Sequence, residues 1–105
     1  MATLTMDTIC GHVNKVTAKS DGKMTHVSIE TTCPKIQKWG TEFDLPMEQI
    51  MDCRNVTLEE KLKTFPLTPT CFVPALVMNV VWMENGMISK SLVKKKSPVQ
   101  IEYND

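Results

Sequence analysis

Two stretches near the N-terminus, residues 9–19 and 24–33, alternate loosely between apolar and polar side chains, with Ser-Asp-Gly-Lys between them. An Asp-Gly pair between two such stretches is typical of a two-residue hairpin turn, in which both central residues have positive φ. The pattern therefore predicts a β-hairpin in which Ser20 lies opposite Lys23 and, further along, Cys10 lies opposite Cys33. Its predicted apolar face consists of Val16, Ala18, Val27 and Ile29, and the face with Lys15, His26, Ser28 and Glu30 is expected to meet water.

Short helices are predicted on both sides of residue 50. Residues 34–39 begin with a proline, which suits the first position of a helix, and are followed by Gly40; the alternative is that this helix continues through residue 43. Thr57 and Glu60 have the spacing of a capping box, which predicts a second helix over residues 58–65.

A third helix is predicted over residues 75–85, which follow Pro74 and are apolar almost all round. Such a composition indicates a buried helix, and Gly86 would end it. The alternative is a hairpin with Asn85 and Gly86 at its turn.

The C-terminal residues predict one more strand, because Val99, Ile101 and Tyr103 alternate with polar residues. The stretch before it, Val-Lys-Lys-Lys-Ser-Pro, is interpreted as a solvated loop. These elements together predict one α+β domain spanning residues 1–105. In it, the hairpin and the C-terminal strand form an antiparallel sheet that packs against two or three helices.

Charge and composition narrow the choice of partners. Twelve basic and twelve acidic residues cancel, so no field would attract nucleic acid or an anionic membrane. The N-terminus shows no signal peptide, and no apolar run approaches the ~20 residues of a membrane span. We therefore expect a cytoplasmic protein that binds no nucleic acid and no membrane, with another protein or a second copy as its expected partner. In a reducing compartment, four cysteines are expected to be free thiols, ligands or redox centres.

Two of the cysteines stand close to predicted helix starts. Cys33 directly precedes Pro34, where free N–H groups and the helix dipole favour a thiolate. Cys71 stands three residues before Pro74, and the apolar helix that follows must pack on the apolar face of the hairpin. If that helix begins at the open end of the hairpin, the three sulfurs of Cys10, Cys33 and Cys71 share one pocket. If it begins at the turn, Cys71 is roughly 30 Å away.

Three short motifs, Ile-Cys-Gly at 9–11, Cys-Pro-x-Ile at 33–36 and Cys-x-Val-Pro at 71–74, resemble those of a family of short uncharacterised proteins of archaea and anaerobic bacteria. The family's cysteines map onto Cys10, Cys33 and Cys71. This chain departs from the pattern at His12 and at Phe72, where the family usually has an aromatic residue and a proline. The resemblance implies a hairpin, helices and a final strand, favours the orientation with all three thiols in one pocket, and implies no known activity.

Three functions remain open, and the chain is not expected to be an enzyme. The first is a binding module in which Cys10, Cys33 and Cys71, with His12 as a further ligand, hold zinc or an iron–sulfur cluster, although the cysteine spacing matches no standard metal motif. The second is a thiol–disulfide redox protein in which Cys10 and Cys33 cycle, Cys33 being the activated thiolate and Cys71 able to resolve a mixed disulfide. The third is a structural or interaction protein whose cysteines and His12 only pack, as is expected of Cys53.

Overall fold

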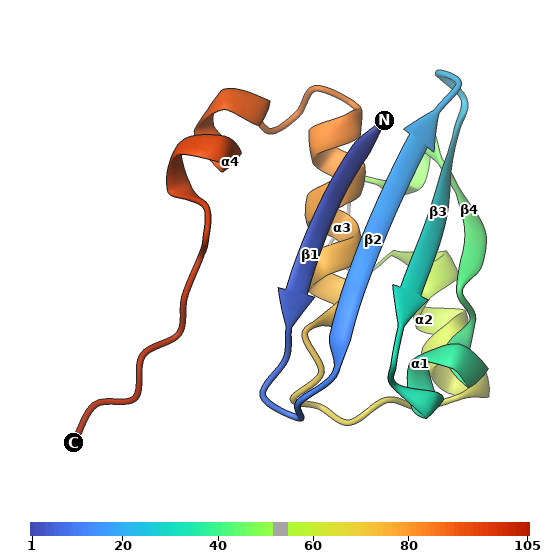
Figure 1. Cartoon of the computed structure of the whole chain (residues 1–105). Coiled ribbons are helices and arrows are strands. Elements are labelled where there is room, and N and C mark those ends of the chain that lie inside the picture. The colour runs from blue at the N-terminus through green and yellow to red at the C-terminus, as the bar shows by residue number, and fades with distance from the viewer. Residues whose placement is uncertain (52–54) are drawn as a thin grey trace.

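The structure is a computed structural model, and it describes residues 1–51 and 55–105. A four-stranded antiparallel sheet has the order β1-β2-β3-β4, and helices cover one of its faces (Figure 1). The chain therefore has the predicted α+β fold. Its strands are β1 (Ala2–Asp7), β2 (Val13–Ser20), β3 (Met24–Thr31) and β4 (Glu42–Pro46), and its helices are α1 (Pro34–Trp39), the 3-10 helix η1 (Met47–Gln49), α2 (Val56–Thr64), α3 (Val73–Glu84) and α4 (Lys90–Lys96).

The predicted hairpin is formed by β2 and β3, but its register differs from the prediction by two residues. Ser20 pairs with Thr25, not with Lys23. The reason is the side chain of Asp21, whose Oδ1 accepts hydrogen bonds from the backbone N–H of Lys23 at 2.9 Å and of Met24 at 2.8 Å and so closes a longer turn. A shift of two residues leaves every side chain on its face. The predicted apolar face is therefore confirmed, with Val16, Ala18, Val27 and Ile29 all buried.

Two strands flank the hairpin where none was predicted. β1 pairs with β2, placing Leu4 opposite Val16. β4 pairs with β3, placing Phe43 opposite Val27 and burying Leu45 completely. The alternative that the first helix continues through residue 43 is wrong, because Gly40, at a φ of 123°, ends α1 and turns the chain back toward the sheet.

α2 lies where a helix was predicted, but its cap is a different residue. Asn55, not Thr57, stands at the N-cap, and its Oδ1 accepts a hydrogen bond from the backbone N–H of Leu58 at 3.1 Å. Farther along α2, Lys61 donates a hydrogen bond from Nζ to the carbonyl oxygen of Trp39 at 2.7 Å. Its ammonium group also lies 4.7 Å from the ring centroid of Trp39 and 4.5 Å from that of Phe43. These contacts hold the end of the six-residue helix α1 in place.

α3 is the buried helix that was predicted, and the alternative hairpin is wrong. Its side chains pack against β1 and β2, where Val77, Val80 and Val81 are fully buried. The helix ends at Asn85, followed by Gly86 at a φ of 75°, which confirms the predicted end.

The C-terminal strand that was predicted is absent from the described residues, and the expected loop before it is α4. Ser89 caps α4 by accepting a hydrogen bond from the N–H of Leu92. Residues 97–105 then extend away from the body of the molecule (Figure 1). Val99, Ile101 and Tyr103 are 85%, 67% and 91% exposed. The prediction failed because β1 and β4 already occupy the two sides of the hairpin.

Candidate functional site

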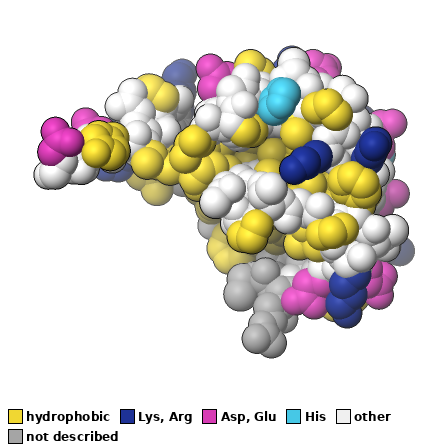
Figure 2. Space-filling model, turned by 90° about the horizontal axis from the view of Figure 1, so that it is seen from below, with side chains coloured by type: hydrophobic (Ala, Val, Ile, Leu, Met, Phe, Trp, Pro, Cys, Tyr) yellow, Lys and Arg dark blue, Asp and Glu magenta, His cyan; other side chains and the backbone are white. Residues whose placement is uncertain are grey.

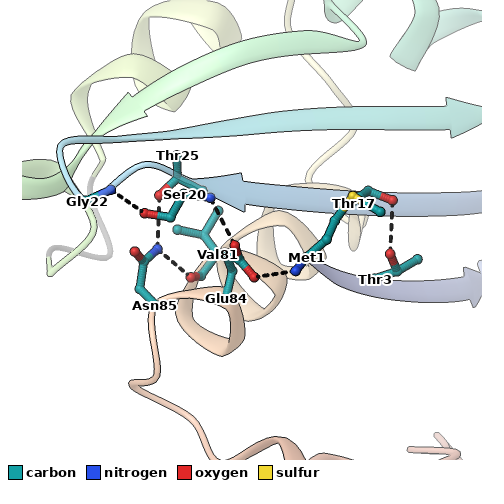
Figure 3. A network of polar contacts seen from close by, with 9 residues as sticks. All are labelled: Met1, Thr3, Thr17, Ser20, Gly22, Thr25, Val81, Glu84 and Asn85. Atoms are coloured by element: carbon teal, nitrogen blue, oxygen red, sulfur yellow. Dashed lines mark hydrogen bonds and ion pairs between the residues drawn. The ribbon is translucent and has the colours of Figure 1, made fainter.

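The orientation of α3 decides where Cys71 lies, and polar contacts at the C-terminal end of this helix hold that orientation (Figure 3). Glu84 accepts a hydrogen bond from the backbone N–H of Ser20 at 3.0 Å and lies 3.3 Å from the N-terminal amine. Asn85 donates hydrogen bonds from Nδ2 to the hydroxyl of Thr25 at 2.9 Å and to the carbonyl of Val81 at 2.8 Å. The end of α3 is thus tied to the turn of the hairpin, so its beginning lies at the open end.

Cys10, Cys33 and Cys71 line one cleft at this open end, with a volume of about 540 Å³. Figure 2 views this end of the molecule and shows hydrophobic side chains, a histidine and basic side chains gathered there. The structure therefore brings the three thiols and His12 into one cleft, which is one of the two outcomes that the sequence left open. The rest of the lining is Thr8, Ile9, Asn14, Pro34, Lys35, Ile36, Leu67, Thr68, Thr70, Phe72 and Val73.

Cys10 lies in the tight turn between β1 and β2 and is exposed. This turn is closed by a hydrogen bond from the N–H of Thr8 to the carbonyl of His12, at 3.0 Å, and Gly11 adopts a φ of 86° within it. The Thr8 hydroxyl lies 2.8 Å from the sulfur of Cys10. This contact is the main reason why the pKa of the Cys10 thiol is lowered, and the backbone N–H of His12 and the positive charge of Lys35 act in the same direction.

The other two thiols are partly buried and pack against the hydrophobic core. Burial raises the pKa of the Cys71 thiol, and the neighbouring sulfurs of Cys33 and Cys10 raise it further. Cys33 stands at the N-cap of α1, but its side chain makes no capping hydrogen bond. The structure lowers the pKa of the Cys10 thiol and raises that of Cys71, whereas the sequence named Cys33 as the activated thiolate.

A chain of hydrogen bonds joins the Cys10 turn to the segment before Cys33. His12 Nδ1 lies 3.0 Å from the Thr32 hydroxyl. Asn14 is only 1% exposed, and its Oδ1 accepts a hydrogen bond from the hydroxyl of Thr31 at 2.6 Å. The same hydroxyl accepts a hydrogen bond from the N–H of Cys33 at 3.0 Å. The two cysteine-bearing segments thus lie side by side, although Cys10 is not the cross-strand partner of Cys33 that the predicted register implied.

The arrangement is a thiol-lined cleft and not a preformed metal centre. Within residues 1–51 and 55–105, no three His, Cys, Asp or Glu side chains stand where they could hold one metal ion. Cys10, Cys33 and Cys71 are free thiols. The interpretation of Cys53 as a packed cysteine lies outside the described residues.

Among the residues that the sequence did not identify, three act on the cysteines or on the segments that carry them: Thr8, Asn14 and Lys35. Thr8 precedes Cys10 by two positions, a spacing at which a hydroxyl can reach a neighbouring side chain, so a local signal was present. Lys35 of α1 and Asn14 of β2 carry no such signal, because only the folded chain brings them into the cleft.

No helix among the described residues has the length and apolar character needed to cross a membrane. The comparisons with curated proteins and with solved structures gave no match. A family model described as a family of unknown function, DUF6951, matches residues 3–96, which include all three cysteines of the cleft. Because this match covers most of the chain, the protein belongs to the DUF6951 family.

Proposed function

We propose that this protein carries out thiol–disulfide exchange from the cleft at the open end of the hairpin, with Cys10 as the attacking thiolate and Cys33 as the resolving thiol. The observation that carries this proposal is the difference between neighbouring thiols: Cys10 is exposed with a lowered pKa, while Cys71 is partly buried with a raised one. Exchange needs a thiolate that a substrate can reach and a second thiol close behind it.

The chemistry uses two successive displacements. The thiolate of Cys10 attacks one sulfur of a substrate disulfide, so that a mixed disulfide forms and the other substrate sulfur leaves as a thiolate. Cys33, after losing its proton to solvent, then attacks the sulfur of Cys10 and releases the second substrate thiolate. The substrate gains two electrons and the protein is left with a Cys10–Cys33 disulfide, which an external dithiol reductant would return to the starting state.

Hydrogen bonds that join residues 12–14 to Thr31 and Thr32 support Cys33 as the resolving thiol, because they keep the two cysteine-bearing segments adjacent. Formation of the Cys10–Cys33 disulfide would bring the Cβ atoms of the two residues to about 3.5–4.5 Å from each other. Gly11 lies in the turn that carries Cys10, with a φ of 86°, and a Cβ added there would meet no atom within 4 Å.

The test is oxidation of the reduced, metal-free protein with glutathione disulfide, followed by mass mapping of the products. We expect a Cys10–Cys33 disulfide in the wild type, and a glutathione adduct that stays on Cys10 in the Cys33→Ser variant. Cys71→Ser should still form the Cys10–Cys33 bond, and Cys53→Ser is the matched control for loss of a cysteine. The proposal is wrong if Cys10→Ser is oxidised as fast as the wild type.

A second candidate function is the binding of a soft metal ion or an iron–sulfur cluster. It is favoured by one observation, that three thiols and a histidine from separate segments line the same cleft. Thiolates and imidazole are the donors that zinc and iron–sulfur clusters take, and Zn–S bonds are about 2.3 Å long. The sulfurs would have to move together on binding, because the described side chains do not stand at metal-binding positions.

Anaerobic reconstitution separates this second function from the first. The protein is incubated with Zn²⁺, or with ferrous iron and sulfide, desalted, and analysed for metal per chain. A stoichiometric metal content that falls in Cys10→Ser, Cys33→Ser and Cys71→Ser but not in Cys53→Ser would establish metal binding. A metal-free product with unchanged folding would exclude it, and the oxidation experiment would still decide the exchange chemistry.

A further inference from the structure

The last nine residues, 97–105, form an extended C-terminal arm that follows α4. Figure 1 shows the arm running away from the sheet, outside the edge formed by β1. Its large apolar side chains are Val99, Ile101 and Tyr103. Tyr103 and Val99 are the two most exposed large hydrophobic side chains among the described residues, and Ile101 is 67% exposed. The family match ends at residue 96, so the arm lies outside the part of the chain that the family shares.

The arm has the sequence pattern of a β-strand, but it pairs with no other strand of the described residues. Val99, Ile101 and Tyr103 alternate with Gln100, Glu102 and Asn104, so in an extended conformation all three apolar side chains would point to one face. A row of exposed apolar side chains on one face of an extended segment is unfavourable in water, and pairing with a sheet edge would bury it. Pro98 is compatible with the first position of such a strand.

β1 supplies an edge that fits. It is the outermost strand on its side of the sheet, and beyond it no further strand is formed by the described residues. Its core-facing side chains are Ala2, Leu4 and Met6, of which only Ala2 is fully buried. The apolar layer between the sheet and α3 is therefore incomplete at this edge. An added strand with its apolar side chains on the same face would cover Leu4 and Met6.

We infer that the C-terminal arm of one molecule adds as a fifth strand to β1 of a second copy, and that the exchange is reciprocal. The lengths agree, since residues 98–103 and β1 each have six residues and span about 20 Å as strands. In Figure 1 the arm and β1 of the same molecule run in the same direction, so pairing within one chain would be parallel in a sheet that is otherwise antiparallel. A two-fold related copy can present its arm in the antiparallel direction, and both interfaces are then identical.

The first measurement is sedimentation of the full chain over a range of concentrations. We expect a dimer for the wild type, and for Ile101→Asp a dissociation constant raised at least about 100-fold. The variant removes one apolar side chain from each of two equal interfaces, and each such loss corresponds to roughly tenfold. Gln100→Asp is the matched control, since it introduces the same charge on the opposite face of the strand and should leave the dimer in place.

The second measurement identifies the edge. In the dimer, the amides of β1 should exchange with solvent more slowly than in Ile101→Asp, and a mixed labelled sample should show contacts between the arm of one copy and β1 of the other. A wild type that stays monomeric at the concentrations used for NMR would overturn the inference. So would a dimer that Ile101→Asp leaves intact, protection of β1 that does not depend on concentration, or arm contacts with any other surface.

Discussion

The hydroxyl group of Thr8 is the largest cause of the lowered pKa of the Cys10 thiol. The hydroxyl of Thr8 lies 2.8 Å from the sulfur of Cys10 and 3.2 Å from the carbonyl oxygen of His12. It has one proton to donate, so it can stabilise the thiolate only by turning from the carbonyl to the sulfur. Thr8→Val should therefore raise the pKa of Cys10 and lower the rate of its alkylation at neutral pH severalfold.

The pH profile of iodoacetamide labelling at Cys10, followed by mass spectrometry, measures this effect. The wild-type profile should have its midpoint at lower pH than that of Thr8→Val, whereas both should reach the same rate once the thiol is fully ionised. Thr5→Val, which removes an exposed hydroxyl of β1, is the matched control and should leave the profile unchanged. Equal midpoints for Thr8→Val and the wild type would show that the hydroxyl does not act on the sulfur.

A histidine on the solvent face of the sheet, His26, makes the stability of the fold depend on pH. His26 lies 2.9 Å from Asp44 and 3.3 Å from Glu42, and hydrogen bonds to these carboxylates raise the pKa of its imidazole. A pKa raised by folding contributes stability that is fully present below the unfolded value of about 6.5 and is lost as pH rises through the folded value. The contribution is small, because all three side chains are about half exposed or more.

NMR titration of the His26 ring tests this directly. Asp44→Asn should move the pKa of His26 down toward its ordinary value, because it removes the largest cause of the shift. Glu48→Gln, a change of the same kind in η1, should not move it. A His26 pKa that is unaffected by Asp44→Asn would contradict the assignment.

At the scale of elements, local signals located the helices better than they identified the caps. The capping-box spacing of Thr57 and Glu60 marked a real helix, but the capping side chain is Asn55. Asn55 is 1% exposed, and its side chain makes two hydrogen bonds. Its Nδ2 donates to the carbonyl of Gln49 at 2.9 Å, and its Oδ1 accepts from the N–H of Leu58 and so caps α2. Asn55→Ala should therefore lower the free energy of unfolding by about 2 kcal/mol, the upper end of the range for a cap.

Thr57→Val is the comparison, because Thr57 donates one hydrogen bond from its hydroxyl to the side chain of Gln49 at 2.7 Å. Thr57→Val should lower the free energy of unfolding by about 1 kcal/mol or less. Urea unfolding of both variants, followed by circular dichroism, gives the two values. A larger cost for Thr57→Val than for Asn55→Ala would show that the threonine is the effective cap.

The strands show why part of the sheet could not be predicted. The alternation of Ala2, Leu4 and Met6 did carry a signal for β1, but a short strand with three threonine and aspartate positions facing solvent resembles an irregular N-terminus. β4 has only five residues and includes a proline, so its pairing with β3 becomes evident only from the fold. The register of the hairpin depended on Asp21, whose side chain made the turn two residues longer than its Asp-Gly pair implied.

At the scale of the whole molecule, the site exists because α3 has one orientation. Sequence reasoning left two orientations open, because an apolar helix packs equally well on an apolar face in either direction. Contacts of Glu84 and Asn85 with residues 1, 20 and 25 decide between them. The hydrogen bond between Ser20 and Glu84 joins residues 64 positions apart, and that between Thr25 and Asn85 joins residues 60 positions apart. Such long-range polar pairs carry no local pattern, so the convergence of the three thiols could be stated from the sequence only as one of two outcomes.

Within the described residues, the sheet contains β4, which the sequence did not predict, and lacks the C-terminal strand that the sequence did predict. This difference predicts which substitutions will destabilise the protein. Leu45 of β4 is fully buried, whereas Ile101 of the C-terminal arm is 67% exposed. Leu45→Ala should lower the free energy of unfolding by about 2–5 kcal/mol, a large share of the stability of a small domain. Ile101→Ala should change it by less than about 0.5 kcal/mol when measured at a concentration low enough to keep the chain monomeric. Urea unfolding of the two variants side by side would contradict the structure if the arm residue proved the more costly, since the final strand would then belong to the sheet of its own chain and β4 would not.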